Sequence, residues 1–228
     1  FYNVSFTSPL AAPAVTGANT YNNLSIAGNT SAGDNICTFD SNQTVNGTFT
    51  VSAGTDATMR TFIQSSTVGT AQTFTCAAVS LTDVDFRDST IAGAASPASG
   101  TRLGDCKGNS GITFPAGVNK YWNLAAGGNW SATGWATTGG GTPAVNNFPL
   151  AQDTAIFQST GLNSATTVTI NANYNIGTID MSLRTSNTMT LQMGTTNPVI
   201  YGNWINGTGI SLAGGQTVLF TGRTTQQF

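Results

Sequence analysis

Short runs of alternating hydrophobic and polar residues recur along the whole chain. Residues 167–170 read Thr-Val-Thr-Ile, and residues 79–81 read Val-Ser-Leu. A period of two is that of a β-strand with one buried face, and the Gly, Asn and Ser residues between the runs favour turns. The pattern therefore predicts strands in the segments 21–26, 48–51, 73–77, 79–86, 166–170, 174–181, 198–201 and 217–221.

Two parts of the chain look like copies of one module. Residues 20–48 resemble residues 174–204 in the order of their strand-forming and turn-forming residues. Each module places an apolar residue at every second position and then turns at Gly or Asn, which suits stacked coils that share one core. We therefore expect an all-β fold with right-handed parallel β-solenoid (β-helix) segments. A Greek-key β-sandwich is the alternative, because the spacings between the strands are irregular.

A stretch of different composition separates the two modules. Residues 93–152 are rich in Gly, Pro and Trp, and such residues punctuate regular structure. The sequence predicts a β-solenoid segment at 1–92, a Gly/Pro/Trp-rich excursion or cap at 93–152, and a second β-solenoid segment at 153–228. We expect this last segment to be truncated, because the chain stops without a capping turn, as if further strands followed.

Composition narrows the chemistry that the chain can perform. Charged residues make up 7% of it, and it contains neither His nor Glu. General acid–base and nucleophilic catalysis rely mostly on His, Glu, Asp, Lys or an activated Cys, so architecture and adhesion are favoured over catalysis. The formal net charge of -2 offers no basic patch for nucleic acid. No apolar run approaches the ~18 residues of a membrane helix, so we expect no membrane insertion.

The cysteines do not indicate a metal or a cofactor. Cys37, Cys76 and Cys106 lie far apart in the sequence, without a Cys-x-x-Cys or Cys/His spacing. This pattern argues against zinc and against a dense disulfide framework. We expect the thiols to act as small buried hydrophobic groups, and we predict no cofactor.

The densest polar cluster comprises Asp83, Asp85, Arg87 and Asp88. On a strand, Asp83, Asp85 and Arg87 point to one face, which would be the outer surface. Two carboxylates can cleave a glycosidic bond, one as acid and the other as base or nucleophile, so Asp83 and Asp85 are the catalytic candidates. The alternative is structural, with Arg87 neutralising the neighbouring Asp side chains. This alternative is favoured, because nothing in the sequence would desolvate one carboxylate enough to raise its pKa. Calcium is a third interpretation, but the spacing matches neither an EF-hand loop nor a calcium-binding β-roll, so we predict no metal site.

Four tryptophans are candidates for adhesion. An exposed indole offers a flat apolar face that can stack on a sugar ring, so Trp122, Trp130 and Trp135 are the glycan-binding candidates, with Trp204 as a further one. The alternative is that Trp122, Trp130 and Trp135 pack together as a plug over the end of a stack of coils, where an apolar row would otherwise meet water. This alternative is favoured, because large aromatic side chains dominate core energetics.

Parts of the sequence resemble known β-repeat proteins. Residues 121–131 contain two Trp and a Gly-Asn-Trp-Ser turn, and Trp135, Phe148-Pro149 and an Asp leading into an apolar run at 153–157 follow. This pattern is similar to one in large secreted and phage-borne β-repeat proteins. Shorter segments resemble tail or fibre proteins of marine bacteriophages: 83–88, 93–95, 102–106 and 109–112. Together the similar segments fall within residues 79–182.

The resemblance implies a virion appendage, at the virion surface or otherwise extracellular. The expected function is that of a non-enzymatic structural and attachment segment of a bacteriophage tail fibre, tailspike or capsid fibre that adheres to host-surface glycan. The implied partners are other virion proteins, further copies of the chain, with a trimer favoured, and host surface polysaccharide. Two alternatives are a glycan-degrading depolymerase that uses Asp carboxylates on the same scaffold, and a bacterial surface adhesin or extracellular filament.

Overall fold

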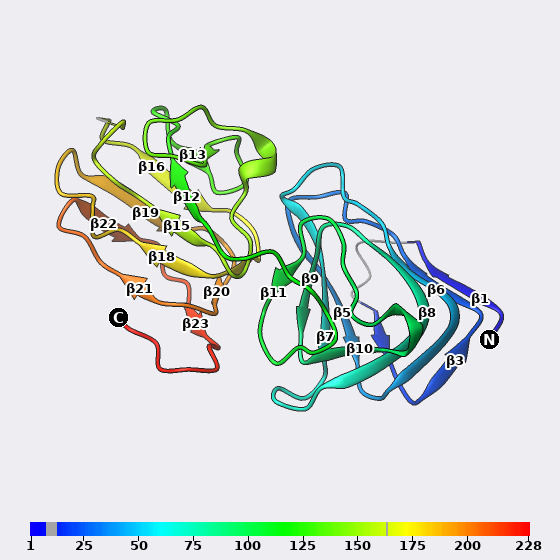
Figure 1. Ribbon diagram of the computed structural model, residues 1–228. Helices are drawn as coiled ribbons and strands as arrows, with labels where there is room; N and C mark the ends of the chain where they lie inside the picture. Colours follow the sequence, from blue (N-terminus) through cyan, green and yellow to red (C-terminus); the bar gives the residue numbers. More distant parts are fainter. Residues whose placement is uncertain (8–12, 163) are drawn as a thin grey trace. The chain divides into compact units, whose positions relative to one another are not determined.

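The computed structural model describes residues 1–7, 13–162 and 164–228 (Figure 1). Nearly all regular structure in these residues is β, and the described helices are two short 3₁₀ turns, η1 (Gly93–Ala95) and η2 (Val145–Asn147). The expectation of an all-β fold is thus confirmed. The chain divides into two compact units, unit 1 (Phe1–Pro115) and unit 2 (Ala116–Phe228).

In unit 1 the chain alternates between two sheets. Sheet I contains β1 (Asn3–Phe6), β3 (Asn19–Tyr21), β4 (Asn23–Ile26), β6 (Gln43–Val51), β8 (Gln72–Leu81) and β10 (Ser89–Ala92). Sheet II contains β2 (Ala14–Val15), β5 (Gly33–Phe39), β7 (Met59–Ser65), β9 (Val84–Arg87) and β11 (Gly104–Asp105). Every described strand pairing in both sheets is parallel. Paired residues lie roughly 20 to 30 positions apart, a separation typical of repeat architectures.

Apolar side chains in register form the core of unit 1. Leu24, Phe49 and Val79 are partners on β4, β6 and β8, and Leu24 and Phe49 are completely buried. The ring of Phe74 stacks on that of Phe49 at a centroid distance of 5.2 Å, and Phe39 of sheet II meets Phe74 edge-on at 4.7 Å. Burying one such side chain stabilises the fold by roughly 1.5–3 kcal/mol, so these columns hold sheets I and II together.

In unit 2 the chain visits three sheets in a fixed order. Sheet III contains β12 (Asn119–Trp122), β14 (Trp135–Ala136), β15 (Thr154–Ile156), β18 (Thr178–Asp180) and β21 (Trp204–Ile205). Sheet IV contains β13 (Gly128–Asn129), β16 (Thr167–Ile170), β19 (Met189–Met193) and β22 (Ile210–Ala213). Sheet V contains β17 (Asn175–Ile176), β20 (Val199–Ile200) and β23 (Leu219–Phe220). From β15 onward the chain passes from sheet III to IV to V and repeats that order to its last strand.

Parallel pairing also dominates unit 2. Among the residues that the structure describes, β12 and β14 form the one antiparallel pair. A Greek-key sandwich consists of antiparallel neighbours, so the observed pairing differs from that alternative.

Two of the predicted strands are each divided by a local backbone requirement. The segment 79–86 bends at Asp83, whose φ is 55°, so β8 ends before it and β9 starts after it. The segment 174–181 bends at Gly177, where a Cβ atom would lie 2.1 Å from the carbonyl oxygen of Asp153. Gly177, which lies between β17 and β18, therefore permits a close approach to the backbone of Asp153 that a side chain would prevent.

The Gly/Pro/Trp-rich stretch 93–152 contributes to both units. Its first part contains β11, which extends sheet II beside β9, and the boundary between the units follows at Pro115. Its second part contains β12, β13 and β14: β14 is an edge strand of sheet III, β12 lies next to it, and β13 is an edge strand of sheet IV. The short strands of this stretch therefore continue the sheets on either side of it.

Candidate functional site

Asp83 and Asp85, the catalytic candidates, are buried. Asp85 lies on β9 and Asp83 directly before it, with 0% and 1% of their surface exposed. The sequence predicts that both carboxylates line the outer surface, but Val84 and Phe86, on the other face of β9, are completely buried as well. Because β9 is covered on both faces, its alternating pattern does not separate an inner from an outer side.

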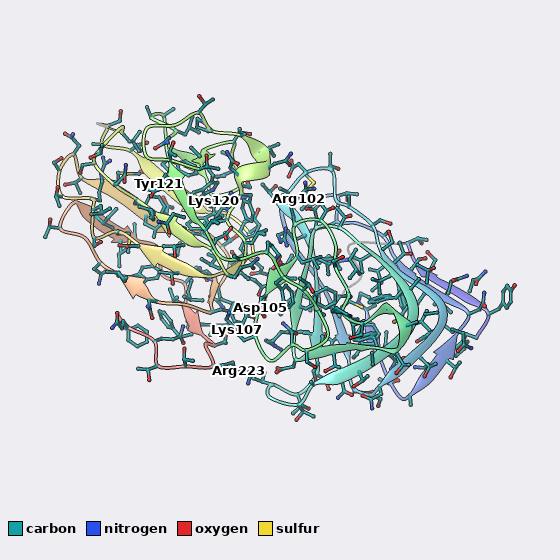
Figure 2. All side chains as sticks on the ribbon, in the orientation of Figure 1. Arg102, Asp105, Lys107, Lys120, Tyr121 and Arg223 are labelled. Atoms are coloured by element: carbon teal, nitrogen blue, oxygen red, sulfur yellow. The ribbon has the colours of Figure 1, made fainter. Side chains whose placement is uncertain are left out.

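The partners of the two carboxylates are two arginines. Arg60 lies on β7, and Arg102 lies in the bend before β11. Arg60 on β7 donates from Nε to Asp85 Oδ1 at 2.9 Å and from Nη2 to the same oxygen at 2.5 Å. Arg102, labelled in Figure 2, donates from Nε to Asp83 Oδ1 at 2.5 Å and from Nη2 to Asp83 Oδ2 at 2.7 Å. Arg60 Nη1 also lies 3.8 Å from Asp83 Oδ1. With Asp34, the register partner of Arg60 on β5, these residues form what we call the charge cluster.

The pKa values of both arginines in the charge cluster are raised. Burial alone would lower the pKa of Arg60, but the charge and hydrogen bond of Asp85 and the charges of Asp34 and Asp83 outweigh it, so that pKa is raised. The hydrogen bond to Asp83 is the main cause of the raised pKa of Arg102. A general acid must present a protonated carboxyl group to its substrate. Here both carboxylates are hydrogen-bonded to guanidinium groups, an arrangement suited to a structural link between adjacent parts of sheet II.

Arg87 does not neutralise Asp83 or Asp85 as the structural alternative predicts. Its Nε atom lies 3.7 Å from Asp88 Oδ2, and its guanidinium carbon lies 5.4 Å from the centre of the Phe62 ring. Asp88 Oδ2 also accepts a hydrogen bond from the backbone N–H of Gly69 at 2.9 Å. Arg87 therefore pairs with one neighbouring aspartate and covers an aromatic ring.

No metal centre is visible in the described part of the chain. Within residues 1–7, 13–162 and 164–228, no three His, Cys, Asp or Glu side chains are grouped closely enough to hold an ion. The calcium interpretation requires Asp83, Asp85 and Asp88 to bind one shared ion. Instead, Asp83 and Asp85 bind arginines, and Asp88 binds the backbone N–H of Gly69. The three cysteines are buried, as expected, and none of them forms a disulfide within the described residues.

The three tryptophans singled out as glycan-binding candidates pack against one another. Trp122, Trp130 and Trp135 are at most 1% exposed. The rings of Trp122 and Trp135 meet edge-on at 5.2 Å, those of Trp130 and Trp135 at 4.7 Å, and Phe157 lies 5.7 Å from Trp135. No indole face of these three is open to a sugar ring, and the packing alternative describes their arrangement. Trp204 is 6% exposed.

The outer face of sheet I is an uncharged surface that the sequence patterns did not single out. Ser5, Ser25, Thr50 and Ser80 occupy one register row across β1, β4, β6 and β8. None of the described strands of sheet I contains Asp, Lys or Arg. A depression of about 310 Å³ lies over this face, lined by Asn3, Val4, Ser5, Asn23, Ser25, Thr48 and Thr50. The signal in the sequence is the Ser, Thr or Asn that recurs at alternate positions in much of these strands.

A second depression lies beside Tyr121 in unit 2. It measures about 550 Å³ and is lined by Gly117, Val118, Asn119, Tyr121 and Thr137. The amide of Asn119 donates to the hydroxyl of Tyr121 at 3.4 Å. Figure 2 labels Tyr121 and its neighbour Lys120 on β12. Tyr121 is not among the residues that the sequence pattern indicated, because the neighbouring tryptophans were the aromatic candidates.

Comparison with known proteins does not add to these observations. No family model, curated protein or solved structure matches the chain. In the described residues, no helix has the length and hydrophobicity that crossing a membrane requires.

Proposed function

We propose that this chain is a non-enzymatic structural and attachment segment of a bacteriophage tail fibre, tailspike or capsid fibre. In this proposal each unit is a segment of parallel β-solenoid, and the coils within a unit stack into a rigid segment of the appendage. The appendage holds its binding surfaces away from the particle, where they contact host-surface glycan. The chain assembles with other virion proteins and with further copies of itself, with three-fold symmetry favoured.

The observation that carries the proposal is the strand order of unit 2. Strands β15, β18 and β21 pair in parallel in sheet III, and each is followed by a strand of sheet IV and a strand of sheet V. A coil of this kind cannot bury its row of apolar side chains alone. Stacked coils bury these rows against one another and so form one continuous hydrophobic core. Backbone groups are paired along such a stack, which favours rigidity and resistance to proteolysis.

Charge placement supports attachment in preference to catalysis. The carboxylates of Asp83 and Asp85 bind Arg60 and Arg102 inside unit 1, and the outer face of sheet I carries hydroxyl groups and no charge. A depolymerase would need an accessible carboxylate pair at a saccharide-binding groove. Hydroxyl and amide groups are suited to hydrogen-bond the many hydroxyls of a glycan.

Immunogold labelling of purified phage particles whose genome encodes this chain tests the proposal. They would be labelled with gold-conjugated antibodies raised against the chain and viewed by electron microscopy. We expect gold on a fibre or spike of the particle. Gold on the surface of bacterial cells, with none on particles, would instead support a bacterial adhesin and overturn the proposal.

A second measurement addresses the non-enzymatic part. The purified chain would be incubated with capsular polysaccharide and lipopolysaccharide, and newly formed reducing ends would be quantified. We expect none above the background of a boiled sample. Release of reducing ends above that background would establish a glycan-degrading activity and refute this part of the proposal. Its loss in a D83N or D85N variant that keeps the circular dichroism spectrum of the original chain would assign the activity to these aspartates.

A further inference from the structure

The depression beside Tyr121 combines an aromatic side chain with polar and aliphatic groups. Asn119 and Tyr121 are two positions apart on β12, so their side chains lie on the same side of the strand, opposite to that of Lys120. Val118 is 50% exposed, which is high for a large hydrophobic residue. Thr137 follows β14, which pairs with β12. The walls of the depression therefore offer an aromatic ring, an aliphatic side chain, an amide and a hydroxyl.

The strand that carries Tyr121 is held in place from both sides. In sheet III, β12 pairs with β14 on one side and with β15 on the other. The residue after Tyr121 is Trp122, whose ring is locked in the aromatic core against Trp135. Asp153 accepts a hydrogen bond from the backbone N–H of Val118 at 2.9 Å, which holds the backbone of this lining residue in place. A preformed surface of this kind binds without the entropic cost of ordering a loop.

The lining points to an uncharged, amphipathic ligand. None of the five residues that line the depression carries a charge. It is an open depression of about 550 Å³, so a ligand lies against it and keeps one side in solvent. A sugar ring has an apolar face of C–H groups and an edge of hydroxyl groups. Tyrosine suits such a ligand because it joins a flat apolar body to a polar tip.

We propose that the Tyr121 depression is a binding subsite for a neutral saccharide. The ring of Tyr121 stacks on the C–H face of one sugar unit, and Val118 extends this apolar surface. Asn119 and Thr137 hydrogen-bond the hydroxyl groups at the edge of the sugar. This inference rests on the proposed attachment function and assigns it a site and a class of ligand. The buried tryptophans act as the support of the subsite.

Affinity electrophoresis of the full chain through gels containing dextran, galactomannan or xylan tests the inference. We expect at least one of these neutral polysaccharides to retard the chain, whereas the anionic polysaccharide alginate does not. The substitution Tyr121→Ala should weaken binding about tenfold, and Tyr121→Trp, which keeps a flat aromatic face, should preserve it. Thr137→Val should weaken binding about threefold, because it removes one hydroxyl. Tyr2→Ala is the matched control, because Tyr2 is 78% exposed and belongs to unit 1.

Folding and binding are separated by recording circular dichroism and thermal unfolding of every variant. Retardation of the original chain that persists unchanged in a folded Tyr121→Ala variant would overturn the inference, as would the absence of retardation by all three neutral polysaccharides. If antibody labelling places the chain on phage particles, either result leaves the attachment function standing. Conversely, Tyr121-dependent binding by a chain that is absent from particles would refute the phage location and retain the saccharide site.

Discussion

Arg60 and Asp85 form an ion pair inside unit 1, with Nε and Oδ1 2.9 Å apart and both side chains at most 2% exposed. The two residues lie on adjacent strands, β7 and β9, and the pair therefore links successive parallel strands of sheet II. Taking two charges out of water is costly, so such a pair adds little net stability compared with well-packed apolar residues. Removing one partner nevertheless leaves an uncompensated buried charge, which is strongly destabilising.

We therefore expect Asp85→Asn to lower the free energy of unfolding by about 3 kcal/mol, because Arg60 keeps its charge and loses the nearest of its counter-ions, with which it makes both of its hydrogen bonds to a carboxylate. Urea denaturation followed by circular dichroism measures the change. The matched control is Lys107→Gln, which breaks the more exposed pair between Lys107 and Asp105, 3.1 Å apart. An exposed pair contributes up to about 1 kcal/mol. Equal losses in the two variants would show that the buried pair has no special importance.

Gly104 leaves room for the Asp85 carboxylate. A Cβ atom at position 104 would lie 1.9 Å from Asp85 Oδ1 and 3.4 Å from Arg60 Nη2. Gly104→Ala should therefore displace the carboxylate from the guanidinium and cost about 3 kcal/mol of unfolding free energy, measured in urea. The control is Gly215→Ala, where the added carbon would meet no atom within 4 Å. Its effect should stay within about 0.5 kcal/mol. Unchanged stability of Gly104→Ala would mean that the carboxylate has another favourable position.

The limits of sequence-based prediction are visible in the strands of sheet II. In sheet IV, by contrast, the alternating pattern predicted a strand at 166–170, and the structure has β16 at Thr167–Ile170. The failures concern sheet II. The pattern did not predict β5, because Gly33 and Asn35 occupy inward positions that the pattern expects to be apolar. It also did not predict β7, where four consecutive residues are buried and no alternation remains. Burial on both faces of a strand removes the signal that a period of two provides.

The candidate site was only partly accessible from the sequence for a related reason. Asp83 and Asp85 stand out locally in the sequence. Their partners Arg60 and Arg102 lie about 20 residues away in either direction, a separation typical of stacked repeats. Only the parallel register of the strands brings these partners together. The sequence favoured a cluster of Trp122, Trp130 and Trp135, because large aromatic side chains dominate core energetics. Composition alone could not decide whether its faces were open to solvent.

Alkaline conditions should destabilise unit 1 through two buried thiols. Burial raises the pKa of Cys37 and of Cys76 to about 12, compared with an ordinary value of 9.0. Below pH 9.0 both states keep the thiol protonated, so the stabilisation is fully present. As the pH rises from 9.0 towards 12, the unfolded chain loses these protons while the folded chain keeps them, and stability falls. The slope is about 1.4 kcal/mol per pH unit for each thiol.

Urea midpoints measured between neutral pH and pH values in this interval check the alkaline prediction. Burial is also the main cause of the raised pKa of Tyr21, which adds to the same trend. The double variant C37A/C76A isolates the thiols: it should be less stable at neutral pH because of lost packing, but its stability should fall less steeply with rising pH. Identical slopes for the two proteins would contradict the assignment to Cys37 and Cys76.

Arg184 organises a turn of unit 2 without a carboxylate partner among the described residues. It is completely buried, and burial lowers its pKa. Its guanidinium donates to four backbone carbonyl oxygens: those of Gln158 at 2.9 Å, Leu162 at 2.6 Å, Ser164 at 2.7 Å and Asn187 at 2.5 Å. A planar guanidinium presents five donors in a rigid geometry, whereas an ammonium presents three on a flexible stem. The carbonyl groups of this turn therefore depend on an arginine, and a positive charge alone is not sufficient.

We expect Arg184→Lys to lower the free energy of unfolding by about 2 kcal/mol and Arg184→Met by about 3 kcal/mol, because buried carbonyl groups lose their donors. Hydrogen exchange should rise in peptides that cover 158–162 and 184–187, while peptides from sheet I stay protected. Arg223→Lys is the matched control, since Arg223 is exposed, and its effect should stay within about 0.5 kcal/mol. If Arg184→Lys proved as stable as the original chain, charge alone would suffice at this position. The hydrogen-bond geometry would then not be what orders the turn.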